Sequence, residues 1–201
     1  MKKSALLSLL IALCVVLLSA CTPEGYCNIL LLTDNLNRIN GNKLLSLSSY
    51  TLEDNSYKLL LKNQDSLVLL TAEENEKGEI KKVRLTVSKA DEKGSIISLT
   101  PSQGEFYRSE AAKILEAFTL MEREKCEETV KKILPMKSED FSRTGELTMD
   151  VEDYHLIYYS NKICCQFTVT NRFLEKTEST RKPESKPLYG VTANTVISSA
   201  P

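Results

Sequence analysis

Tryptophan is absent from this chain, histidine occurs once, and glycine occurs only seven times in 201 residues. So little glycine, with no internal repeat at solenoid periods, excludes low-complexity and repeat proteins and indicates an ordinary packed domain. Lysine and arginine number 26 against 27 aspartate and glutamate residues. Because no positive surplus is available for phosphate contacts, we expect no nucleic-acid partner.

Catalytic motifs are also lacking. The chain has no CxxC or HExxH spacing, no GxSxG motif and no phosphate-cradling glycine loop. The acidic group at Asp150, Glu152 and Asp153 is typical of a solvated turn. We therefore expect no enzyme, no metal site and no cofactor. One catalytic alternative stays open, a Cys–His nucleophilic pair of Cys164 with the only histidine, His155, although no third orienting residue is apparent.

The first 20 residues have the pattern of a secretory signal peptide. Lys2 and Lys3 form a positive start, and an apolar run follows from Ala5 to Ala20. This run is short for a membrane span, which needs roughly 20 apolar residues, and no basic flank follows it. We therefore expect cleavage of residues 1–20.

The end of the apolar run, Leu18-Ser19-Ala20-Cys21, resembles the lipobox of bacterial lipoproteins. The resemblance covers only the leader and the anchor. It implies that Cys21 becomes the mature N-terminus and carries a diacylglycerol and an amide-linked acyl chain such as palmitate, so that residues 21–27 form a lipidated tether. Thr22, and not aspartate, follows the cysteine. By similarity to enteric lipoproteins, this favours an outer-membrane anchor facing the periplasm over the inner membrane.

An exported chain folds in an oxidising compartment, where cysteines are candidates for disulfides. With Cys14 in the leader and Cys21 lipidated, four cysteines remain, and four allow three connectivities. Neighbouring strand residues point to opposite faces, so Cys164 and Cys165 should have different partners. We favour the bridges Cys126–Cys165 and Cys27–Cys164 over a strained vicinal bridge.

The periodicity of apolar residues predicts the secondary structure. Residues 29–39 have helical spacing, with Gly41 just beyond the end. From residue 44 to residue 100 the period is two, which indicates five short antiparallel strands, the first with Leu45 and Leu47 and the last at residues 95–100. Residues 105–134 carry a long apolar helical stripe, as one helix or as two joined near Lys125, with a capping box at Ser102 and Glu105. Three further strands are expected at residues 145–152, 154–159 and 162–170.

These elements predict an α+β fold, an antiparallel sheet of about seven to eight strands with one long helical segment packed on one face. Residues 28–171 should form a single domain, and residues 172–201 a flexible tail. A tight turn that pairs Tyr159 with Lys162 would put Tyr154, Leu156, Tyr158, Ile163, Cys165, Phe167 and Val169 on the core face of the last hairpin.

The leading functional hypothesis is a non-enzymatic envelope lipoprotein that binds a protein partner, as an envelope or secretion accessory or as an immunity or exclusion factor. Ile157 and Tyr159, on the outer face of the last hairpin, are the expected partner contacts. The alternative is a carrier of a lipid or other apolar ligand in the periplasm. This alternative depends on Leu60 and Leu70, which we expect to line a second apolar face.

Overall fold

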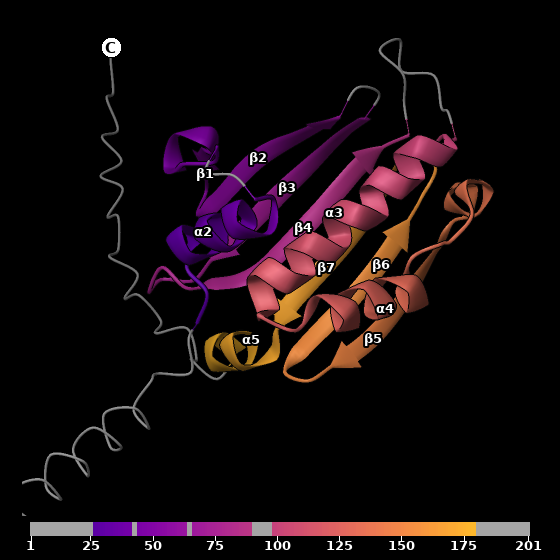
Figure 1. The fold of residues 1–201 in the computed structure, drawn as a ribbon. Helices are drawn as coiled ribbons and strands as arrows, with labels where there is room; N and C mark the ends of the chain where they lie inside the picture. The colour runs from indigo at the N-terminus through magenta and orange to yellow at the C-terminus, as the bar shows by residue number, and fades with distance from the viewer. Residues whose placement is uncertain (1–25, 42–43, 64–65, 90–97, 180–201) are drawn as a thin grey trace, which may run out of the picture.

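A computed structural model describes residues 26–41, 44–63, 66–89 and 98–179 of the chain. The expected signal peptide, Cys21 and residues 180–201 lie outside these ranges. Within them the chain folds as an α+β domain, in which helices pack on one face of a seven-stranded antiparallel sheet (Figure 1). The predicted fold class is confirmed.

The sheet is built from two meanders. Strands β1 to β4 follow one another, strands β5 to β7 follow one another, and β7 pairs with β4 to join them in the order β1-β2-β3-β4-β7-β6-β5. Short turns connect the strands within each meander, so neighbours are antiparallel. The strands are β1 Thr51–Glu53, β2 Ser56–Asn63, β3 Ser66–Glu74, β4 Ile80–Ser88, β5 Gly145–Val151, β6 Tyr154–Ser160 and β7 Cys164–Asn171.

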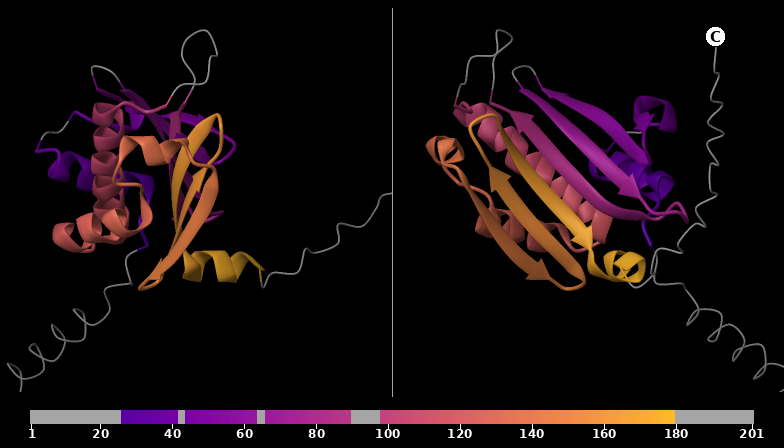
Figure 2. Two further views of the ribbon diagram at one scale, coloured as in Figure 1. Left: turned by 90° about the vertical axis from the view of Figure 1, so that its right-hand side faces the viewer. Right: turned by 180° about the vertical axis from the view of Figure 1, so that it is seen from behind.

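Within the described ranges, helices cover one face of this sheet, and a further helix lies at the end of β7 (Figures 1 and 2). The covering helices are α2 Ile29–Ile39, α3 Pro101–Thr119 and α4 Arg123–Ile133, and the further helix is α5 Arg172–Ser179. Two short 3₁₀ helices, η1 Leu47–Ser49 and η2 Ser138–Ser142, lie in the connections. The α2 helix agrees with the predicted range. Its N-cap Asn28 accepts a hydrogen bond from Leu31 N–H, and Gly41 follows its end with a φ of 68°.

The core lies between the sheet and the covering helices. Leu70, Leu85 and Phe167 lie side by side on β3, β4 and β7 and are fully buried. Tyr107 of α3 is buried above them and donates a hydrogen bond from its hydroxyl to the carbonyl oxygen of Leu85, at 3.1 Å. Burial of each such side chain contributes roughly 1.5–3 kcal/mol. Alternate strand residues therefore hold the sheet against the helices.

The helical segment is two helices, as one of the two sequence interpretations allowed, but the break comes earlier than Lys125. α3 ends at Thr119, and the next residue, Leu120, has a left-handed φ of 61° that terminates the helix before α4 begins. The predicted capping box is wrong by two residues. Thr100 is the N-cap: its hydroxyl accepts a hydrogen bond from Gln103 N–H, and its own N–H donates to Gln103 Oε1. The helix starts here because Pro101 is well suited to the first helical position.

Two of the five strands expected before the helices are not strands in the described residues. Residues 47–49 form η1, and Ser46 N–H donates to Ser49 Oγ at 3.1 Å, a local bond that competes with strand pairing. Of the segment 95–100, residues 95–97 lie outside the described ranges. Residues 98–100 have no strand structure and lead into the cap of α3.

The register predicted for the last hairpin is wrong, although its faces are right. Tyr159 lies opposite Gln166, not Lys162, because Asn161 caps a wider turn and accepts hydrogen bonds from Ile163 N–H and Cys164 N–H. This displaces the pairing by four residues, an even number, so the alternation of faces is preserved. Only Ile163 leaves the predicted core face, because it lies exposed in the turn.

The segment expected to be a flexible tail starts instead as helix α5. Asn171 accepts hydrogen bonds from Phe173 N–H and Leu174 N–H, which starts the helix, and Leu174 is buried with 4% of its surface exposed. Composition alone indicated disorder here, but one apolar anchor and one cap are enough to order the first turns.

Candidate interaction surface

The face of the sheet opposite α2, α3 and α4 is uncovered along its middle strands in the part of the chain that the structure describes. Figure 2, seen from behind, shows these strands in front with no helix across them. We call this surface the open face. Because strand side chains alternate, it is formed by the neighbours of the buried residues. Its central members are Lys58, Leu60, Leu69, Thr71, Lys82, Arg84, Thr86, His155, Ile157, Tyr159, Gln166, Thr168 and Thr170, of which the two last threonines are buried among their neighbours.

The apolar residues of the open face lie in two groups. Leu60 and Leu69 face each other across β2 and β3, and Leu60 has 47% of its surface exposed. On the other side, Ile157 lies opposite Thr168 and Tyr159 lies opposite Gln166. The structure thus places both predicted contact residues on this face. The threonine-rich middle of the sheet separates the two groups.

Charge on the open face is concentrated at one end. Glu73 on β3 accepts from Lys82 Nζ at 3.3 Å and lies 3.6 Å from Arg84 Nη2, so two cations share one carboxylate. Arg84 Nε is buried and has no hydrogen-bond partner among the described residues. Arg84 lies on the open face because it alternates with the buried Val83 and Leu85 along β4, and its pairing across from β3 brings it near Glu73.

His155 and Asp150 form a histidine–carboxylate pair on this face, an arrangement that also occurs in catalytic sites. Its Nδ1 lies 2.6 Å from Asp150 Oδ1, and Arg172 Nη1 lies 3.3 Å from Asp150 Oδ2. The hydrogen bond from His155, and further the positive charge of Arg172, lower the pKa of Asp150 below its usual value. No serine, threonine or cysteine bonds to His155 within the described residues, so this pair lacks a nucleophile.

The Cys–His alternative of the sequence analysis is wrong. His155 lies opposite Thr170, while Cys164 lies opposite Ser88, six residues further along β7. At about 3.3 Å per residue, this separates the two by roughly 20 Å. The predicted register had placed them on a diagonal, and the displaced turn removes that contact.

The predicted disulfides are wrong for the same geometric reason, and all four cysteines of the described domain are free thiols. The carbonyl oxygen of Cys27 accepts from Ile80 N–H at one end of β4, whereas Cys164 pairs with Ser88 at the other end. Eight residues of strand, roughly 26 Å, separate those ends. A disulfide needs Cα atoms within about 7 Å.

Cys126 and Cys165 also lie at opposite ends of the sheet, although both face the core. An ion pair between Lys125 and Glu152 places the start of α4 at the turn between β5 and β6. Cys165 pairs with Ser160 at the far end of β6. Burial raises the pKa of Cys27 to about 12 and that of Cys126 to about 11, which keeps both thiols protonated and unreactive.

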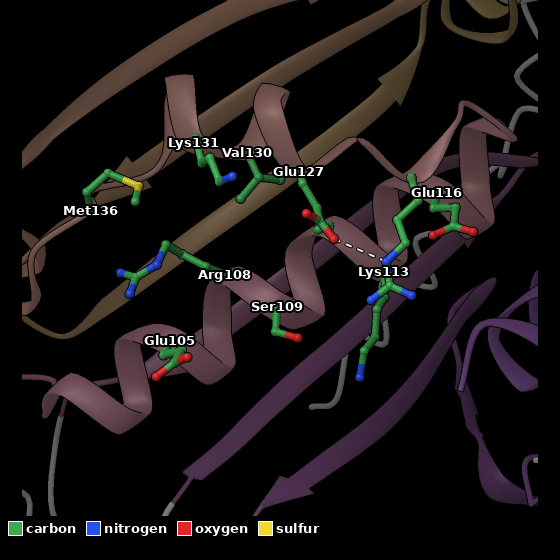
Figure 3. A pocket seen from close by; sticks show the side chains of 11 residues that line it. Glu105, Arg108, Ser109, Lys113, Glu116, Glu127, Val130, Lys131 and Met136 are labelled. Atoms are coloured by element: carbon green, nitrogen blue, oxygen red, sulfur yellow. Dashed lines mark hydrogen bonds and ion pairs between the residues drawn. The ribbon is translucent and has the colours of Figure 1, made fainter. Parts of the chain in front are cut away.

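An open groove of about 280 Å³ lies between α3 and α4, on the side of the helices away from the sheet (Figure 3). Its cations are largely engaged. Arg108 donates to the carbonyl oxygen of Pro135 and lies over the ring of Phe141, and Arg123 pairs with Glu127. Both signs of charge line the groove, so it has the character of a solvated helix surface. Its lining residues are Glu105, Arg108, Ser109, Ala112, Lys113, Glu116, Arg123, Glu127, Val130, Lys131 and Met136.

Neither a metal centre nor a membrane span is found in the described ranges. No three His, Cys, Asp or Glu side chains within them are placed to bind one ion together. None of the described helices combines the length and the apolar character that crossing a bilayer requires.

Comparisons with protein-family models, with curated proteins and with solved structures found no match to this chain. Within the part of the chain that the structure describes, the open face is a side of the sheet that no helix covers (Figure 2).

Proposed function

We propose that this protein is a lipid-anchored envelope lipoprotein, held in the outer membrane through Cys21, that binds a protein partner through the open face. The observation that carries the proposal is the open face itself. Two apolar groups, Leu60 with Leu69 and Ile157 with Tyr159, lie there on the two sides of a threonine-rich middle. Exposed apolar and aromatic side chains, tyrosine among them, are enriched at protein interfaces.

The shape of the surface favours a protein over a small apolar ligand. Ligand sites are concave and mostly apolar, whereas the open face is one side of a sheet with threonine and charged rows. The carrier hypothesis also loses one of its two residues, because Leu70 is fully buried in the core between Leu59 and Leu85. Only Leu60 lies on the outer side as that hypothesis required.

The anchor limits where the partner is found. Cys21 precedes Cys27, the first buried residue among those described, by six positions. Six residues span at most about 22 Å even when fully extended. The domain would stay next to the membrane, so the partner is a membrane protein or one that acts at its surface.

The binding surface is tested by site-specific photocrosslinking in the producing bacterium. A photoreactive phenylalanine analogue replaces Tyr159 in the full-length protein, and the matched control carries it at Leu30, an exposed residue of α2 on the helical side. We expect a discrete protein adduct at position 159 and not at position 30. Leu60→Asp, on the other apolar group of the open face, should abolish that adduct. Equal adducts at both positions, or an adduct insensitive to Leu60→Asp, would contradict the proposal.

The anchor is tested separately. The wild-type chain should incorporate a labelled fatty acid and fractionate with the outer membrane, and Cys21→Ala should abolish both. Fatty-acid labelling that persists in the Cys21→Ala variant would exclude Cys21 as the lipidation site.

A further inference from the structure

The two edges of the sheet differ in how they are protected. β1, at one edge, has only three residues and ends in a turn at Asp54 and Asn55. β5, at the other edge, has seven residues in unbroken register with β6 and contains no proline, no lysine and no bulge. Natural edge strands are normally shortened, bulged or marked by such residues to prevent further pairing. No described element lies beyond β5, so alternate residues direct backbone N–H and C=O groups outward.

The side chains of β5 specify what kind of strand would fit. Leu147 lies on the helical side, opposite the buried Tyr158, yet 54% of its surface is exposed. An added strand would cover it with an apolar side chain. On the open face, β5 carries Glu146 and Asp150. Asp150 is bonded by His155 and Arg172, whereas Glu146 has no ion-pair partner in the described ranges.

We propose that β5 is a strand-addition site for an extended segment of the partner protein, in which apolar residues that cover Leu147 alternate with basic residues that face Glu146. The inference rests on the proposed function, since it names the chemistry of the protein partner. Backbone hydrogen bonds supply affinity in this mode of recognition, and alternate side chains supply specificity. The open face continues directly into the added strand.

A second copy of this chain fits the edge less well. The two-fold antiparallel register that pairs all seven residues of β5 centres on Thr148 and sets Glu146 opposite Asp150 twice. Like charges directly opposite each other destabilise a strand pair. The acidic edge is complementary to a basic strand and not to itself.

The test uses the full-length lipidated protein in detergent and synthetic peptides of about eight residues, near the usual length of a strand. One peptide alternates lysine and valine, a second alternates glutamate and valine, and a third is the lysine–valine peptide with N-methyl groups on alternate amides. We expect binding of the first peptide, protection of β5 amides from hydrogen exchange, and no binding of the N-methylated peptide. Equal binding of the N-methylated peptide, or protection outside β5, overturns the proposal.

Charge reversal gives a rescue experiment. Glu146→Lys should weaken binding of the lysine–valine peptide by about twofold to fivefold, the usual strength of a cross-strand charge pair. It should strengthen binding of the glutamate–valine peptide. Thr51→Lys on the β1 edge is the matched control and should change neither affinity. Both variants alter exposed residues, and thermal unfolding verifies that they fold.

The outcomes separate this proposal from the function proposed above. If no peptide binds while the Tyr159 adduct forms and is lost in Leu60→Asp, strand addition is overturned and the open-face interaction stands. If the adduct does not form while peptides bind β5, the open-face interaction is overturned and strand addition stands. Analytical ultracentrifugation measures whether the protein dimerises. A dimer whose stability changes in Glu146→Lys would show that β5 pairs with a second copy of this chain, and would overturn the proposal of a partner segment.

Discussion

The side-chain nitrogen of Lys89 lies 2.8 Å from Ser160 Oγ and 2.7 Å from the carbonyl oxygen of Asn161, at a position where only 2% of the lysine is exposed. No carboxylate pairs with it in the described residues. Ser160 in turn donates to the carbonyl oxygen of Phe141 at 3.1 Å. This chain of bonds ties the end of β4 to the turn between β6 and β7.

Ser160→Ala should therefore lower the free energy of unfolding by about 1–3 kcal/mol, because it leaves a buried amine with one acceptor. It also leaves the Phe141 carbonyl with only the weak thiol donor of Cys165, at 3.7 Å. Urea unfolding followed by circular dichroism measures the change. Ser109→Ala, on the exposed side of α3, is the control and should change stability by less than about 0.5 kcal/mol. Equal stabilities for the two variants would exclude a structural role for the Lys89 contact.

Leu120→Gly should stabilise the domain by about 0.5–1 kcal/mol. Leu120 has a left-handed φ of 61° and an exposed side chain, so glycine relieves backbone strain and removes little packing. Thermal or urea unfolding measures the gain. Leu120→Ala keeps the Cβ atom and should give no gain, and Leu30→Gly, inside α2, should destabilise by about 1 kcal/mol. A loss of stability in Leu120→Gly would show that the left-handed backbone conformation of Leu120 is not strained.

Unfolding at alkaline pH should depend on Cys27. Burial raises the pKa of its thiol from 9.0 to about 12. Above about pH 9 the unfolded chain loses this proton and the folded chain keeps it, so stability is fully present below that pH and falls as the pH rises toward 12. Cys27→Ala should reduce the slope of unfolding free energy against pH by up to about 1.4 kcal/mol per pH unit. The measurement is a set of urea titrations between about pH 8 and pH 10, with Ser109→Ala, which removes no titratable group, as the control. An unchanged slope in Cys27→Ala would contradict the assignment.

Alkylation should modify Cys164 well before the other three thiols of the domain. Cys27, Cys126 and Cys165 are buried, whereas Cys164 is partly exposed on the outer side of β7. Iodoacetamide pulses followed by mass spectrometry would show Cys164 labelled in the native protein and the others only after urea is added. A non-reduced digest should contain no Cys27–Cys164 or Cys126–Cys165 peptide. Either peptide would refute the strand register described above.

Local sequence patterns predicted most of the helices and strands. The alternation of Val83, Leu85 and Val87 predicted β4, and the helical spacing of residues 29–39 predicted α2, because both signals depend only on neighbours in the sequence. The same alternation placed Ile157 and Tyr159 away from the core. Even a register error of four residues left them on the open face, since four is a multiple of the two-residue period of a strand.

Contacts between distant segments could not be read in this way. A cysteine on the right face still lies at the wrong end of a strand when eight residues separate it from its expected partner, as with Cys27 and Cys164. The order of the strands in the sheet also decided which strand lies at an edge. Because β7 inserts between β4 and β6, β5 is left at the free edge, and periodicity within a strand contains no information about which strand will lie beside it.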